Sequence, residues 1–220
     1  QHGANYGEVE HLTNEKTEKE MSNTYMTWGW CFDEKDYPMP SEKLSTLKKV
    51  DVTAPSLGGR ESNTGQIIWL SRDLRFFQDN GYPLMVDSQL NYGSPLEHIN
   101  AVLSFHGGLS TDIRRRTTLR LKPKDFHDLR RFKSSLRAKL SSELDGISLD
   151  DGKRFLVEKI AEAELVIIDH FPPTAFLECL VLDIPVIAFN TIPFNLLREE
   201  TRPYVEALRD QGVVHEGVTT

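Results

Sequence analysis

The chain has 220 residues, of which 39% are hydrophobic and 27% are charged, the composition of an ordinary globular protein. A formal net charge of −7 argues against general binding to nucleic acid, and no apolar run approaches the roughly 18 residues of a transmembrane helix. Two cysteines, Cys31 and Cys179, favour a reducing compartment over a disulfide framework. Because no cysteine pair occurs at metal-binding spacing and no H-E-x-x-H motif is present, no zinc site is predicted.

The amino-terminal quarter of the chain predicts a helix, a strand and a long connection. Segment 8–21 is polar on nearly all sides, so its helix should lie on the surface. The aromatic and β-branched run 24–30 predicts a strand, and segment 31–64 shows no period. Because the chain opens on Gln1 without an initiator methionine, we expect a fragment of a longer protein.

From residue 66 onward, short apolar runs alternate with amphipathic segments, which predicts repeated β–α units. The predicted strands cover 66–71, 117–121, 165–168, 185–189 and 213–214. The predicted helices cover 94–103, 125–140, 152–163, 175–182 and 194–208. The expected fold class is therefore α/β, with a Rossmann-like parallel sheet and flanking helices.

Segment 163–190 is the centre of this pattern. The run 165–168 has the β-branched apolar content of a strand buried on both faces; Asp169 ends it, and a helix should begin at Thr174. In open α/β sheets, ligands bind where such a loop leaves a strand, and free N–H groups at the helix start favour phosphate. Thr174 and Glu178 share one helix face, where they can meet a phosphate and a ribose. A simple cap and a solvated glutamate are the alternative.

Positive charge gathers between residues 114 and 139. This segment holds eleven Lys or Arg against two Asp, a charge of +9 that leaves −16 for the rest of the chain. Such a block suggests a compact anionic ligand or an anionic membrane surface, with the solvated face of a helix as the alternative. Arg120 and Lys122 lie at the carboxyl edge of the predicted strand 117–121, where they can neutralise a leaving phosphate.

Three segments carry a resemblance to a known family. The first runs from Gln1-His2-Gly3 through Tyr6-Gly7 and an acidic stretch to Trp28-Gly29-Trp30. The second is RLKPKD at 120–125. The third is Asp169-His170 with TAFLE at 174–178 and IPVIAF at 184–189. In this order they resemble a family of transferases from bacterial O-antigen and surface-polysaccharide gene clusters, which look like GT-B glycosyltransferases.

The resemblance implies a metal-independent transferase that moves a sugar from a nucleotide donor. It implies a domain division into 1–60, the end of an acceptor-side domain with the interdomain connection, and 61–220, a donor domain. His2 and Glu8 are the expected catalytic residues. The residues expected to bind the donor nucleotide are Arg120, Lys122, Asp169, His170, Thr174 and Glu178.

The sequence departs from the family pattern at two points. Pro173 stands where the family usually has Ser or Thr, so one phosphate-binding hydroxyl is missing. Only the last pieces of the family's amino-terminal half are present.

The expected partners are a nucleotide sugar as co-substrate and a glycan or lipid-linked glycan as acceptor, with no other cofactor and no nucleic acid. The expected location is the cytoplasm or the inner face of the membrane, where the basic stretch 114–139 would contact anionic lipid. Two alternatives remain. One is another GT-B-like enzyme, such as a nucleotide-sugar epimerase or a polyol-phosphate transferase, and the other is a non-catalytic nucleotide-binding module.

Overall fold

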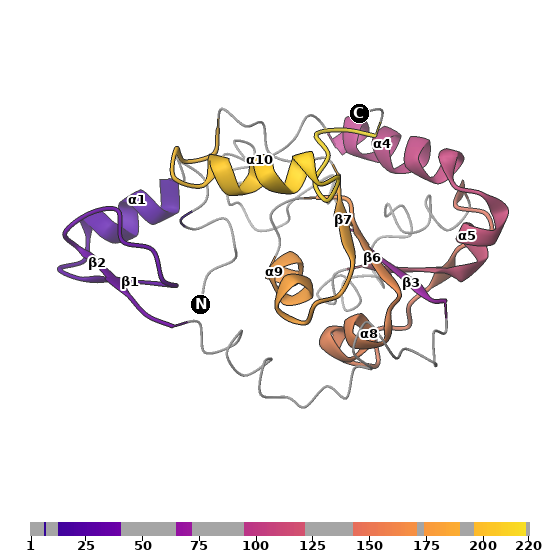
Figure 1. The fold of residues 1–220 in the computed structure, drawn as a ribbon, viewed down its shortest axis with the longest axis horizontal. Coiled ribbons are helices and arrows are strands. Elements are labelled where there is room, and N and C mark those ends of the chain that lie inside the picture. Colours follow the sequence, from indigo (N-terminus) through magenta and orange to yellow (C-terminus); the bar gives the residue numbers. More distant parts are fainter. Residues whose placement is uncertain are drawn as a thin grey trace, which may run out of the picture.

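A five-stranded parallel sheet with helices on both faces forms the centre of the fold (Figure 1). The computed structural model describes residues 7, 13–40, 65–71, 95–121, 143–170, 174–189 and 196–218. The strands are β3 (Ile67–Ser71), β4 (Thr117–Leu121), β5 (Ser148–Leu149), β6 (Leu165–Ile168) and β7 (Val186–Ala188). The helices around them are α4 (Pro95–Gly108), α5 (Thr111–Arg116), α8 (Leu156–Glu162), α9 (Thr174–Val181) and α10 (Arg202–Asp210). The predicted α/β class with a Rossmann-like parallel sheet is confirmed.

The strands follow the order of a doubly wound sheet. All neighbours pair in parallel, in the order β5-β4-β3-β6-β7. Numbered by their place in the chain, these strands run 3-2-1-4-5, so the sheet grows from β3 in one direction and from β6 in the other. Val214 extends it beyond β7 through a parallel bridge to Ala188. The carboxyl ends of β3 and β6, where the direction reverses, are called the switch point below, and sheets of this kind bind ligands there.

The sheet is buried on both faces. One core contains Ile68 and Val166 together with buried residues of α8, α9 and α10. The other contains Trp69 and Ile167 together with buried residues of α4. Figure 1 shows α8 and α9 on one side of the strands and α4 and α5 on the other. Coverage of both faces explains why these strands are continuous apolar runs instead of alternating ones.

Several predicted bounds change in the structure. The predicted helix 194–208 begins only at Arg202, with Pro203 in its first turn, where a missing N–H costs nothing. The predicted strand 213–214 is reduced to the bridge at Val214. Strand β5 was not predicted, because two exposed residues carry no periodic signal. The predicted helix 125–140 lies outside the described residues.

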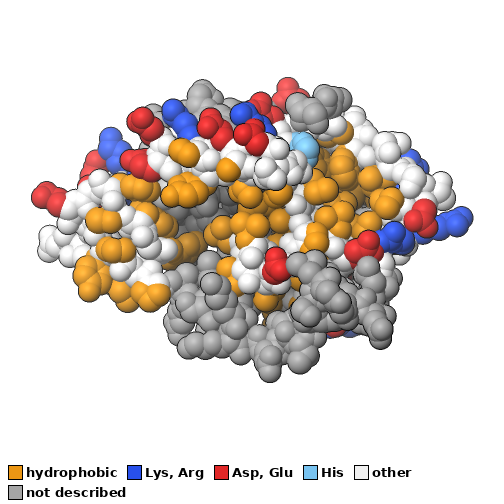
Figure 2. All heavy atoms as spheres, viewed as in Figure 1, with side chains coloured by type: hydrophobic (Ala, Val, Ile, Leu, Met, Phe, Trp, Pro, Cys, Tyr) orange, Lys and Arg blue, Asp and Glu red, His pale blue; other side chains and the backbone are white. Residues whose placement is uncertain are grey.

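A second unit lies beside the amino end of α10 (Figure 1). It consists of α1 (Thr13–Glu20) and the parallel pair β1 (Tyr25–Thr27) and β2 (Asp36–Pro38). The predicted strand 24–30 shortens to β1, since Gly29 adopts a φ of 115° that extended strands do not have. Figure 2 shows hydrophobic side chains exposed over this unit. Its large exposed hydrophobic residues are Met21, Met26, Tyr37 and Met39.

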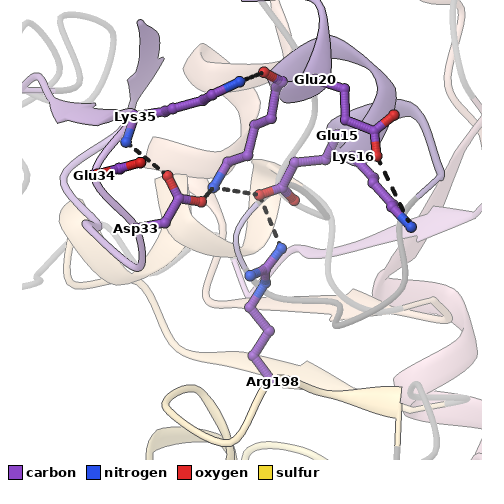
Figure 3. A pocket seen from close by; sticks show the side chains of 8 residues that line it. Glu15, Lys16, Glu20, Asp33, Glu34, Lys35 and Arg198 are labelled. Atoms are coloured by element: carbon purple, nitrogen blue, oxygen red, sulfur yellow. Dashed lines mark hydrogen bonds and ion pairs between the residues drawn. The ribbon is translucent and has the colours of Figure 1, made fainter.

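Glu15 of α1 joins this unit to the segment that precedes α10. Its buried carboxylate accepts hydrogen bonds from the Gly7 backbone N–H at 3.0 Å and from Arg198 Nη2 at 2.9 Å. Figure 3 shows Arg198 reaching across to Glu15. The guanidinium of Arg198 also lies 4.9 Å from the ring centre of Phe32. Because a buried carboxylate is costly without partners, these contacts hold together two segments that are 183 residues apart.

Gly7 fits its position only because it has no side chain. Its φ is 79°, and a Cβ there would lie 2.6 Å from the ring of Trp30. The Tyr6-Gly7 and Trp28-Gly29-Trp30 motifs therefore meet through backbone-to-ring packing.

Arg120 of β4 is a buried cation with partners inside the protein. Its Nη1 donates to Asp150 at 3.0 Å and its Nη2 to the carbonyl of Arg154 at 2.9 Å. Lys159 contacts the other oxygen of Asp150 at 3.0 Å. Burial alone raises the pKa of Asp150, but the Gly152 N–H, Lys159 and Arg120 outweigh burial and hold that pKa below its usual range.

Substitution of Gly7 by Ala should destabilise the protein by about 1–3 kcal/mol, because the new methyl group collides with the Trp30 ring at an unfavourable φ. Gly107→Ala is the matched control. Its Cβ would meet nothing within 4 Å in helix α4, so it should leave stability unchanged or raise it slightly. Urea denaturation measures both, and equal stability of the two variants would contradict the packing argument.

Arg120→Ala should cost about 1.5–3 kcal/mol of stability, because Asp150 loses a charge-assisted hydrogen bond but keeps Lys159 and the Gly152 N–H as partners. The free energy of unfolding from urea titration tests this expectation. A variant that keeps wild-type stability but loses ligand binding would show instead that Arg120 serves a ligand.

Candidate functional site

Asp169 lies at the switch point. It follows directly on β6, and its backbone N–H donates to the carbonyl of Leu70 at 3.3 Å. This bond continues by one residue the parallel register that pairs Leu70 with Ile168. Asp169 is thereby placed next to Ser71, the last residue of β3, so the ends of two strands contribute to one edge.

The Asp169 side chain has no exposed surface and is surrounded by three ring systems. Its Oδ2 accepts a hydrogen bond from Nε1 of Trp69 at 3.2 Å. Its Oδ1 lies 3.1 Å from Nδ1 of His170 and 3.7 Å from Nε2 of His98. Trp69 comes from β3, His98 from the first turn of α4, and His170 from the chain that leaves β6. Three separate elements therefore supply partners to one carboxylate.

The partners of Asp169 outweigh its burial. Burial raises the pKa of a carboxyl, but the His170 hydrogen bond, the charges of His98 and His170, and the Ser71 hydroxyl together hold the pKa of Asp169 below its usual range. The carboxylate is thus the stable form at neutral pH. A carboxylate that is ionised inside the protein can orient an imidazole and stabilise positive charge on it.

His170 is the member of this cluster that reaches solvent. Its side chain is 24% exposed, whereas that of Asp169 is fully buried. Because Nδ1 faces Asp169, the opposite ring nitrogen, Nε2, is left for contacts outside the cluster. The expectation that Asp169 and His170 lie at the carboxyl end of β6 is met by this geometry.

Helix α9 begins shortly after His170 and presents Thr174 and Glu178. Thr174 is the first residue of the helix and is half-buried. Glu178, one turn later on the same side, is only 4% exposed, so it is not the solvated glutamate of the alternative interpretation. Burial, and secondarily the Glu178 charge, raises the pKa of Cys179 to about 12, so this thiol is unreactive at neutral pH.

Arg120 is a predicted site residue that the structure does not bring into this cluster. It is directed to Asp150 and Arg154, as described above. Lys122, His2 and Glu8 lie outside the described residues, so their roles stay predictions.

His98, Ser71 and Trp69 belong to the cluster but were not predicted. Ser71 ends a predicted strand, as residue 168 does, so the carboxyl-end rule could have identified it. His98 lies in the first turn of a helix that follows β3, which places it at the same edge. For Trp69 no signal was available, because it occupies a buried strand position like any core residue.

A separate pocket of about 400 Å³ lies on the unit of α1, β1 and β2 (Figure 3). It is lined by four acidic and four basic side chains: Glu15, Lys16, Lys19, Glu20, Asp33, Glu34, Lys35 and Arg198. Many of these charges pair with each other, as Lys19 does with Asp33 at 2.9 Å. No residue of the switch point lines this pocket, and its balanced charge points to no ligand class.

Among the residues that the structure describes, no three His, Cys, Asp or Glu side chains converge in a way that could hold a metal ion. In the same part of the chain, no helix has the length and apolar content needed to cross a membrane.

In the basic segment 114–139, Arg114 donates to the Gly107 carbonyl and Arg116 pairs with Glu164, so part of the positive charge of this segment is used within the protein.

Comparison with known proteins identifies a family for the chain. No curated protein matches it, and no solved structure matches it either. The family model described as LIC12162 family transferase matches residues 1–219. The match includes both the amino-terminal motifs and the switch point, and it supports the transferase class that the motifs predicted. The chain therefore belongs to the LIC12162 family of transferases.

Proposed function

We propose that this transferase moves a sugar from a nucleotide-activated donor to a glycan or lipid-linked glycan acceptor of a bacterial surface polysaccharide such as O-antigen. The observation that carries the proposal is the position of Asp169 and His170. Asp169 is buried and His170 is partly exposed, and they contact each other at the switch point of a doubly wound sheet, where nucleotides bind in this architecture. Membership of a transferase family supports group transfer as the chemistry of that site.

In this proposal the donor lies at the carboxyl ends of β6 and β7, with its phosphate against the amino end of α9. The amino end of a helix, through its dipole, favours an anion. The Thr174 hydroxyl is available to the phosphate, and Glu178 is positioned one turn on to accept hydrogen bonds from the ribose. The burial of Glu178 supports this role, because a carboxylate in a dry site gains more from a polar ligand than a solvated one.

The leaving phosphate would be stabilised by the helix end and by basic side chains, without a metal ion. Lys122 is the proposed cation, since the guanidinium of Arg120 already has Asp150 and the Arg154 carbonyl as partners. His2 and Glu8 would act on the acceptor from the amino-terminal side of the site.

We also propose a two-domain organisation like that of GT-B enzymes. Residues 1–60 would belong to an acceptor-side domain, and residues 61–220 form the donor domain. The parallel pair β1 and β2 supports this division, because parallel strands normally form part of a larger sheet that is covered on both faces. Met26 of β1 and Tyr37 of β2 are exposed, as strands in need of a covering layer would be.

Glu178→Gln in the full-length protein should weaken nucleotide binding by about tenfold or more, because it removes a charge-assisted hydrogen bond of about 1.5–3 kcal/mol to the ribose. Calorimetric titration with CMP, UDP and GDP measures the affinity, and thermal melting verifies the fold.

Glu206→Gln is the matched control, since Glu206 is an exposed glutamate on α10. It should bind nucleotide as the wild type does. Unchanged affinity of Glu178→Gln, with the wild type binding one of the three nucleotides, would show that the ribose lies elsewhere.

A further inference from the structure

We propose that His170 is the base that removes the proton from the attacking acceptor hydroxyl, with Asp169 and His98 as the residues that position it. The inference rests on the proposed sugar transfer, and it gives His170 a catalytic role in addition to contact with the donor. It also offers a base within the described part of the chain, as an alternative to His2 and Glu8.

The Asp169 contact determines which nitrogen of His170 carries the hydrogen. Nδ1 of His170 lies 3.1 Å from Oδ1 of Asp169. An ionised carboxylate can only accept, so Nδ1 carries the hydrogen, and the neutral ring keeps its lone pair on Nε2. The side chains of Asp169 and His98 are 0% and 7% exposed, against 24% for His170. Within the described cluster, His170 is therefore the side chain best placed to meet a bound substrate, and Nε2 is its ring nitrogen that does not face Asp169.

His98 and Trp69 give the Asp169 carboxylate further partners besides His170. Nε2 of His98 approaches the same Oδ1 of Asp169 at 3.7 Å from helix α4, and the Trp69 N–H donates to the other oxygen at 3.2 Å. The carboxylate is thus held from α4 and β3 as well as by His170, which keeps it in place to orient the His170 ring. The neutral imidazole is the form of a histidine that acts as a base.

The transfer step can be written with this group. The acceptor oxygen forms a bond to the anomeric carbon, and its proton passes to Nε2 of His170. The bond between the anomeric carbon and the phosphate oxygen breaks, and its electron pair leaves with the nucleotide. Asp169 stabilises the imidazolium, which later returns the proton to water through the exposed edge of the ring. Since the anomeric carbon is bonded to the phosphate oxygen, a group near a phosphate at the start of α9 is also near the reacting carbon.

His170→Asn removes the proposed base and keeps the contact with Asp169. The Asn amide keeps a donor near the position of Nδ1, so Asp169 remains paired, but Nε2 is lost. In the full-length protein, with CMP-, UDP- and GDP-linked sugars as probes, this variant should still bind the donor, with a loss of affinity much smaller than its loss of turnover. Release of nucleotide with water as acceptor should fall by about a hundredfold or more, the usual contribution of a general base.

His98 is tested with two substitutions. His98→Leu removes the contact with Asp169 and should lower nucleotide release while donor affinity is kept. His98→Gln places an amide donor near the position of Nε2 and should restore release. NMR correlation through the ring nitrogens should show the hydrogen on Nδ1 of His170 in both the wild type and His98→Gln, and urea denaturation verifies that each variant is folded.

The outcomes distinguish this inference from the proposed function. Wild-type nucleotide release by His170→Asn, or a hydrogen on Nε2 of the wild-type ring, overturns the assignment of His170 and leaves the proposed function standing. Full release by His98→Leu overturns the role of His98. If the wild type binds none of the three classes of nucleotide sugar, the proposed function fails, and the base assignment fails with it.

Discussion

The burial of the Asp169 carboxylate is the constraint on which the candidate site depends. An ionised carboxyl group without water is costly unless partners surround it, and here an indole and one imidazole lie at hydrogen-bond distance while a second imidazole lies at 3.7 Å. The partners come from β3, α4 and the chain after β6, so the charge can be buried only when these three elements are assembled. The same contacts leave one imidazole, that of His170, at the surface with a defined orientation.

Two further buried carboxylates act in the same way elsewhere. Asp150 meets Arg120 across 30 residues of sequence, and Glu15 meets Arg198 across 183 residues. Each pair joins segments that the hydrophobic core alone would hold less specifically, because apolar contacts are tolerant of direction and ion pairs with hydrogen bonds are not. In this protein the buried ion pairs therefore fix the relative orientation of the segments they join. The apolar strands supply most of the stability.

The Glu15 contact also gives the amino-terminal motifs a structural meaning. Gly7, with a φ of 79°, packs its backbone on the ring of Trp30 and donates to Glu15, which in turn binds Arg198. Gly7 and Trp30 thus help to attach the unit of α1, β1 and β2 to the amino end of α10. A segment that the resemblance placed on the acceptor side is held by this buried carboxylate against the segment before α10, so the contact links the two proposed halves.

The sequence by itself determined the type of most main elements, and it predicted the sheet edge at which the candidate site is proposed. The β-branched runs 67–70 and 165–168, the prolines after Asp169 and the spacing of Thr174 and Glu178 are local signals, and local signals are sufficient for a β–α unit. Only the tertiary structure decided which side chains meet. His98 and Trp69 reach Asp169 because β3 and β6 are neighbours and α4 returns over one face, which no local pattern encodes. For the same reason Arg120, which by position alone suits a phosphate, has Asp150 as its partner, since the sheet places the end of β5 beside β4.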